Sequence, residues 1–112
     1  MTQYLVAIHR PRDYDPTTED DAMRRAITAL NDEMVAAGIR IFVGGLQPPS
    51  RAKSVRVRPR GKAAVTDGPY SEAKELIGGF WVLEVPDMEA AMAWGEKAAT
   101  ACRAGVEVRP FW

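Results

Sequence analysis

The order of apolar patterns along the chain is the feature that most constrains its fold. Apolar residues alternate with a period of two in short segments and recur every three or four residues in two longer ones, patterns typical of strands and helices, respectively. We expect strands over residues 3–9, 39–46, 53–59, 63–66, 80–85 and 106–112. We expect one helix between Asp15 and Gly38 and a second from Pro86 to Ala104, closed by Gly105.

This order of elements predicts an α+β fold, the ferredoxin-like split βαβ arrangement with an inserted β-hairpin. A length of 112 residues fits a single domain, 1–112, without a linker. The strands at 3–9 and 80–85 are apolar on both faces, whereas two helices cover only one face of a sheet. We therefore expect a second copy of the chain to cover the other face in a homodimer.

The same periods predict which side chains face the core. The inner stripe of the first helix contains Met23, Ile27, Leu30, Met34 and Ala37. That of the second helix contains Met88, Met92, Gly95, Ala98 or Ala99, and Cys102. In the hairpin, the alternation predicts that Val55 and Val57 point inward and that Ser54, Arg56 and Arg58 point outward.

Composition argues against several classes of partner. Fifteen basic and fifteen acidic residues cancel, which removes the overall attraction to nucleic acids and anionic membranes. The apolar run from Tyr4 to Ile8 has the length of a strand, far short of a membrane span, so a cytoplasmic location is expected. The single cysteine, Cys102, and the absence of Cys/His clusters and of phosphate-binding glycine motifs predict no metal and no cofactor.

Although the net charge is zero, the charged residues are not spread evenly along the chain. The stretch from Arg51 to Lys62 is basic, and no acidic residue occurs between residues 33 and 67. One interpretation is an edge strand that its charges protect from unwanted pairing. The other is a local stripe that attracts an anionic substrate or partner.

Several segments resemble the YCII-related family. They are GGLQPP at 44–49, SVRVR at 54–58, VTDGPYSEAKELIGGFWVLEV at 65–85 and VEVRPF at 106–111. The resemblance is to the branch named for an Asp-Gly-Pro-Phe motif (DGPF), which stands here as Asp67-Gly68-Pro69-Tyr70. It implies a bacterial protein with a dimeric α+β barrel, in a family whose members mostly have no assigned activity.

The resemblance also raises two functional possibilities. Members of the broader family are similar to small-molecule enzymes proposed to use a His-Asp pair, with the histidine near the start of the first helix. Here residues 17–25 read TTEDDAMRR, and the only histidine is His9, at the end of the first strand. Some members of the branch are encoded beside extracytoplasmic-function sigma factors, which makes a regulatory role the second possibility.

His9 and Asp67 are the candidate catalytic residues. An imidazole titrates near neutral pH and suits a general base, although a histidine at a strand end also suits a bond to a backbone carbonyl. Asp67 belongs to an Asp-Gly-Pro turn, and a carboxylate held by such a turn can orient a histidine. If the two side chains meet, the chemistry expected is proton transfer or a lyase-type reaction on a small cyclic or carbonyl substrate.

Four further residues are candidates for ligand binding. Gly44 and Gly45 have no Cβ and allow a ligand to approach the backbone, or mark a bulge or a close packing of strands. Tyr70 and Glu72 follow the Asp-Gly-Pro turn and suit the wall and rim of a cavity, or a solvated loop. The alternative to an enzyme is therefore a non-catalytic ligand-binding or regulatory dimer.

Overall fold

The main sheet contains four antiparallel strands in the order β2-β5-β1-β6. The computed structural model describes residues 1–112. Its main-sheet strands are β1 (Thr2–Pro11), β2 (Arg40–Gly45), β5 (Glu75–Val85) and β6 (Gly105–Pro110). With one helix between β1 and β2 and another between β5 and β6, this is the ferredoxin-like α+β arrangement, as predicted.

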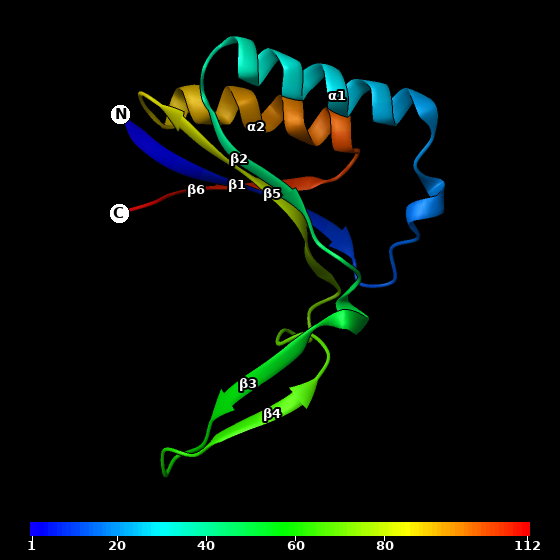
Figure 1. Cartoon of the computed structure of the whole chain (residues 1–112), viewed down its shortest axis with the longest axis vertical. Coiled ribbons are helices and arrows are strands. Elements are labelled where there is room, and N and C mark those ends of the chain that lie inside the picture. The colour runs from blue at the N-terminus through cyan, green and yellow to red at the C-terminus, as the bar shows by residue number, and fades with distance from the viewer.

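Both helices cover the same face of this sheet (Figure 1). Helix α1 (Asp21–Ala36) begins where the Asp20 carboxylate accepts a hydrogen bond from the Met23 amide at 2.8 Å, and it is followed by Gly38 with a φ of 71°. Helix α2 (Met88–Cys102) begins in the same way at Asp87. Its end differs from the prediction, because Arg103 adopts the left-handed conformation there and Gly105 already begins β6.

The core lies between the helices and the sheet. Its largest fully buried side chains are Val6, Met34, Trp81, Leu83 and Val85. A Cβ on Gly95 would lie 2.8 Å from Val108 Cγ2, so this glycine lets α2 approach β6 closely. The predicted stripe of α2 is confirmed at Gly95, Ala98 and Cys102, which are buried. It is wrong at Met88 and Met92, which are exposed, while Ala91 is buried instead.

The opposite face of the main sheet has no helix over it (Figure 1). Because side chains alternate along each strand, the residues between the core positions of β1 and β5 point to this face. Among them, the ring of Phe80 lies 5.7 Å from that of Phe42 in β2, and Phe42 is 53% exposed. This face thus presents an apolar patch on β2 and β5 to solvent, beside the polar residues His9 and Glu107.

The inserted segment forms a separate two-stranded sheet of β3 (Lys53–Val57) and β4 (Ala63–Asp67). It projects away from the main sheet (Figure 1). The predicted orientation is wrong at three residues, because Val55 and Val57 are 56% and 80% exposed while Ser54 is buried. Arg56 and Arg58 are exposed, as predicted. The Ser54 hydroxyl donates to the carbonyl of Gly68 at 2.7 Å, which holds this side chain at the base of the hairpin, while both faces of the rest of β3 meet solvent.

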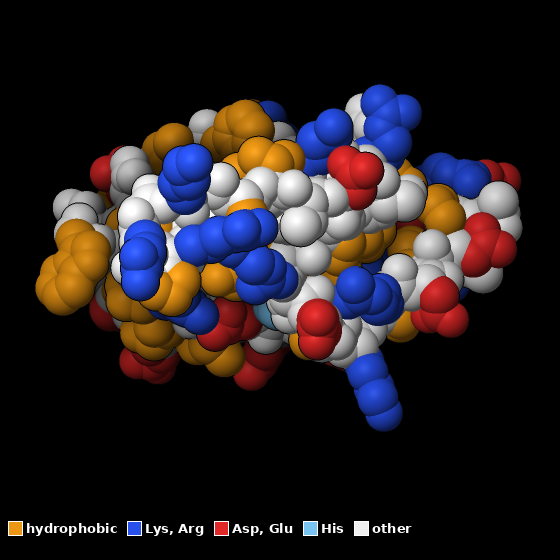
Figure 2. Space-filling view, turned by 90° about the horizontal axis from the view of Figure 1, so that it is seen from below, with side chains coloured by type: hydrophobic (Ala, Val, Ile, Leu, Met, Phe, Trp, Pro, Cys, Tyr) orange, Lys and Arg blue, Asp and Glu red, His pale blue; other side chains and the backbone are white.

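Basic side chains gather on the projecting hairpin. Figure 2, viewed from the side where the hairpin is nearest, shows several Lys and Arg side chains close together. Within the hairpin, Lys53 pairs with Asp67 at 3.5 Å, whereas Arg58, Arg60 and Lys62 form no ion pair. Neither helix has the length and continuous hydropathy that crossing a bilayer requires.

Candidate functional site

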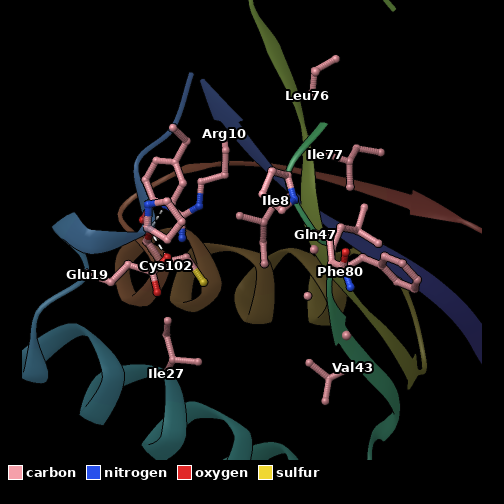
Figure 3. Close-up of a pocket in the computed structure, with 18 of the residues that line it drawn as sticks. Ile8, Arg10, Glu19, Ile27, Val43, Gln47, Leu76, Ile77, Phe80 and Cys102 are labelled. Carbon is pink, nitrogen blue, oxygen red and sulfur yellow. Dashed lines mark hydrogen bonds between the residues drawn. The ribbon is translucent and has the colours of Figure 1, made fainter. Parts of the chain in front are cut away.

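A cavity of about 330 Å³ opens on the helix side of the main sheet. The ends of β1 and β2, the first half of β5 and the segment leading into α1 enclose it. Apolar side chains form most of its wall, including Ile8, Ile27, Val43 and Ile77. Figure 3 shows Arg10, Glu19 and Cys102 together at one end of the cavity and Val43 and Gln47 toward the other.

A bulge in the pairing of β1 with β5 shapes this cavity. Ile8 pairs with Gly79 and His9 with Ile77, which leaves Gly78 as the extra residue. A Cβ on Gly79 would lie 3.0 Å from the carbonyl oxygen of Gly44, so the glycines let β2 and β5 approach closely. A Cβ on Gly78 would lie 2.7 Å from Arg10 Cγ, so the stem of Arg10 occupies the space above the bulge.

Arg10 is the cation of the cavity. Its Nη1 donates to the carbonyl of Cys102 at 2.6 Å, and its guanidinium carbon lies 4.4 Å from the centroid of the Tyr14 ring. No ion pair of the protein includes Arg10. The guanidinium is therefore held in place by a carbonyl and an aromatic face and faces the cavity without a neighbouring carboxylate in contact.

Tyr14 and Glu19 stand beside Arg10. The Tyr14 hydroxyl donates to Glu19 Oε2 at 2.8 Å across the short 3-10 turn η1 (Pro16–Thr18). Asp15 fixes this turn, because its carboxylate accepts from the amide and the hydroxyl of Thr17. Burial raises the pKa of the Tyr14 hydroxyl, and the hydrogen bond to Glu19 raises it further, so the phenol stays protonated at neutral pH.

Hydrogen bonds of Asn31 link the residues at the floor of the cavity. Asn31 Oδ1 accepts from Trp81 Nε1 at 2.9 Å and from Arg40 at 3.0 Å, while its amide donates to the carbonyl of Ile27 at 3.0 Å. Cys102 is buried there, and burial raises the pKa of its thiol, so it remains a protonated, unreactive side chain at neutral pH. No three His, Cys, Asp or Glu side chains lie close enough to hold a metal ion.

Comparison of the sequence with known proteins assigns the chain to a family. The family model described as the YCII-related domain matches residues 1–112. The chain belongs to the YCII-related family. An uncharacterised protein of Rhizobium meliloti strain 1021 is 30% identical to this family member over 95 residues, which are 83% of this chain and 76% of the relative.

The candidate catalytic residues of this YCII-related protein do not meet within the chain. His9 alternates with Ile8 and Arg10 and points to the opposite face of the sheet from the cavity, where its Nε2 lies 4.0 Å from Glu107. Asp67 lies on the hairpin, 3.5 Å from Lys53. No hydrogen bond or ion pair connects His9 to Asp67.

Two of the four candidate ligand-binding residues line the cavity, and two lie outside it. Gly44 and Gly45 line the cavity, where their backbone forms part of the wall. Tyr70 lies outside it, with its ring stacked 4.1 Å from the guanidinium of Arg56 and its carbonyl accepting from the same side chain. Glu72 is exposed in the loop before β5 and forms no side-chain hydrogen bond or ion pair.

Sequence reasoning missed the polar end of the cavity, Arg10, Tyr14 and Glu19. A signal for Arg10 was available, since it continues the alternation of Tyr4, Val6 and Ile8 that faces the core. A charged residue in phase with a buried face is unusual and indicates a partner or a cavity. Tyr14 and Glu19 carry no comparable signal, because the turn that brings them to Arg10 has no apolar period.

Proposed function

We propose that this YCII-related protein binds a small organic molecule in the cavity beside Arg10. The observation that carries the proposal is a cavity with largely apolar walls whose charged and hydroxyl groups gather at one end. Its volume of about 330 Å³ lies at the lower end of the range for small-molecule sites. Such a site suits a compact ligand with an apolar body and one polar group.

A thermal-shift screen of small aromatic and branched aliphatic compounds tests this proposal. A ligand present at 100 times its dissociation constant adds about 2.7 kcal/mol of stability, which is a readily measured shift. Val43→Trp places an indole in the cavity and is expected to abolish the shift. Val35→Trp, on the exposed surface of α1, is the matched control and should keep it. Equal shifts in both variants would contradict the proposed site.

We also propose that two copies pair through the uncovered face of the main sheet. Alternation along β1 and β5 directs Leu5, Phe80 and Val82 to that face, next to the exposed ring of Phe42. An apolar sheet surface of this kind is stable in water when a second layer covers it. A second copy supplies an identical apolar layer, which fits a symmetric interface.

Catalysis by His9 and Asp67 stays a prediction, because it requires contacts that the single protomer does not make. The cavity and His9 lie on opposite faces of the sheet, so ligand binding in the cavity does not depend on the imidazole. Retention of any measured turnover in a His9→Ala, Asp67→Ala double variant would remove the catalytic assignment.

A further inference from the structure

We infer that the cavity selects compact organic carboxylates and that Arg10 binds their carboxylate group. This inference rests on the proposed function, since it names the chemical class of the ligand. Three contacts restrain Arg10: its stem lies over Gly78, its Nη1 donates to the Cys102 carbonyl at 2.6 Å, and its guanidinium stacks on the Tyr14 ring. A guanidinium has five N–H donors, and only one of them is used by the protein.

The free edge of this guanidinium suits a planar anion. A carboxylate accepts two parallel hydrogen bonds from an arginine, a geometry that an ammonium group does not offer. Stacking on Tyr14 keeps the guanidinium plane fixed, so less freedom is lost when the ligand binds. Arg10 is half-buried, and partial removal from water strengthens its interaction with an anion.

The remaining groups of the cavity favour a monoanion over a phosphate. Arg10 and Glu19 are the only charged residues among those that line it, and Glu19 already accepts a hydrogen bond from Tyr14. A phosphate monoester carries about −1.5 to −2 charges at pH 7. The guanidinium of Arg10, with the Glu19 carboxylate nearby, would leave the charge of a bound phosphate poorly compensated. The single negative charge of a ligand carboxylate is matched by Arg10 alone.

The apolar wall defines the rest of the ligand. Ile8 and Val43 continue from Arg10 toward the other end of the cavity, and Ile27 lies below Cys102 (Figure 3). A ring or a branched aliphatic chain attached to the carboxylate fits this direction. The class is therefore an aromatic or branched-chain monocarboxylate rather than a sugar or a nucleotide, which would need more polar partners.

Binding of carboxylates and their neutral isosteres tests the inference. The probes are benzoate with benzamide, phenylacetate with phenylacetamide, and isovalerate with isovaleramide, together with phenyl phosphate, titrated by calorimetry into the full chain. We expect at least one carboxylate to bind at least about tenfold more tightly than its amide, since a hydrogen bond to a charged group is worth that much. We expect phenyl phosphate to bind more weakly than benzoate.

Variants identify the group that recognises the carboxylate. Arg10→Met is expected to lower carboxylate affinity about tenfold or more and to leave amide affinity unchanged. Arg25→Met, an exposed arginine on α1 without an ion pair or side-chain hydrogen bond, is the matched control and should change neither. If Arg10→Met does not fold, Arg10→Lys keeps the charge, loses the planar fork and is expected to lower carboxylate affinity alone.

The outcomes separate this inference from the proposed function. Equal affinity for carboxylates and amides, with both lost in Val43→Trp, overturns the carboxylate assignment and leaves the cavity as a binding site. Tighter binding of phenyl phosphate, or unchanged carboxylate affinity in the Arg10 variants, also overturns it. Failure of every probe to bind overturns both proposals.

Discussion

At the scale of single residues, the glycine at position 78 decides where Arg10 can lie. The bulge removes Gly78 from the regular pairing of β1 with β5, and the missing side chain leaves space for the arginine stem. Arg10 then reaches both the Cys102 carbonyl and the Tyr14 ring. The position of the cation in the cavity thus depends on a residue that contributes no side chain.

Gly78→Ala tests this dependence. The added Cβ would lie 2.7 Å from Arg10 Cγ, so the arginine must move, and such overpacking costs about 1–3 kcal/mol of unfolding free energy. We expect denaturant titration to show this loss and calorimetry to show weaker carboxylate binding. Gly105→Ala is the control, because its Cβ meets no atom within 4 Å and should change neither quantity by much. Unaltered binding in Gly78→Ala would contradict the role given to the bulge.

At this scale, some site residues could be predicted from the sequence and others could not. Gly44 and Gly45 could be singled out because paired glycines in a strand indicate a close approach, and they do line the cavity. His9 and Asp67 were interpreted as neighbours. Whether they meet depends on how far the hairpin lies from the end of β1, and local sequence patterns do not determine that distance. Assignment of the chain to the Asp-Gly-Pro-Phe branch of the family likewise stays a prediction.

At the scale of elements, capping joins α1 to the end of α2. The Asp20 carboxylate accepts from the Met23 amide and pairs with Arg103, which follows α2, at 3.0 Å. The hydrogen bond from Met23 and that from Arg103 lower the pKa of Asp20. One exposed carboxylate therefore helps to fix both helices over the cavity.

Asp20→Ala is expected to lower stability at neutral pH, because the helix loses its cap and Arg103 its partner. The folded-state pKa of Asp20 is below the unfolded value of about 3.9, so its contribution is present above that pH and is lost as the pH falls through the folded pKa. Melting temperatures of the wild type and the variant should differ at pH 7 and converge in strong acid. A difference that persists unchanged at the lowest pH would contradict this role.

The elements themselves were mostly predictable, and their faces only partly. Period and breakers located all the strands of the main sheet and both helices, because Gly and Pro interrupt the apolar patterns clearly. The predicted start of β5 at residue 80 is wrong, because the strand already begins at Glu75 and continues through the glycines. Alternation in the hairpin distinguished a valine face from a polar face but could not show that neither face is covered beyond Ser54, since the hairpin leaves the main sheet. In α2, small residues such as Ala91 are buried against the sheet while Met88 and Met92 are exposed. The period of apolar residues alone does not show that the small ones are preferred at this contact.

At the scale of the whole molecule, the two faces of the main sheet have different roles. The helix side contains the core and the cavity, while the opposite side presents Phe42 and Phe80 without cover. The equal numbers of acidic and basic residues hide a basic hairpin at one end (Figure 2). We expected a second copy because the strands have more apolar residues than the two helices can cover. The sequence pattern of one chain does not show how the second copy would dock.

Light scattering tests the pairing of copies. At micromolar concentration we expect a mass near twice 12.3 kDa for the wild type. Phe42→Asp puts a charge on the uncovered sheet face and should give a monomer, because an unpaired charge in an apolar interface is costly. Val35→Asp, on the outer surface of α1, is the matched control and should remain dimeric. A monomeric wild type would contradict the proposed interface.

The most direct test of the cavity as the binding site is amide chemical-shift mapping by NMR. Compounds of the carboxylate and carboxamide panel that raise the melting temperature would be added to ¹⁵N-labelled protein. We expect the largest shifts at the amides of Gly44, Gly45, Gly78 and Gly79 and at Arg10, which border the cavity. Shifts concentrated at His9, Glu107 and the uncovered sheet face, or on the β3–β4 hairpin, would contradict it.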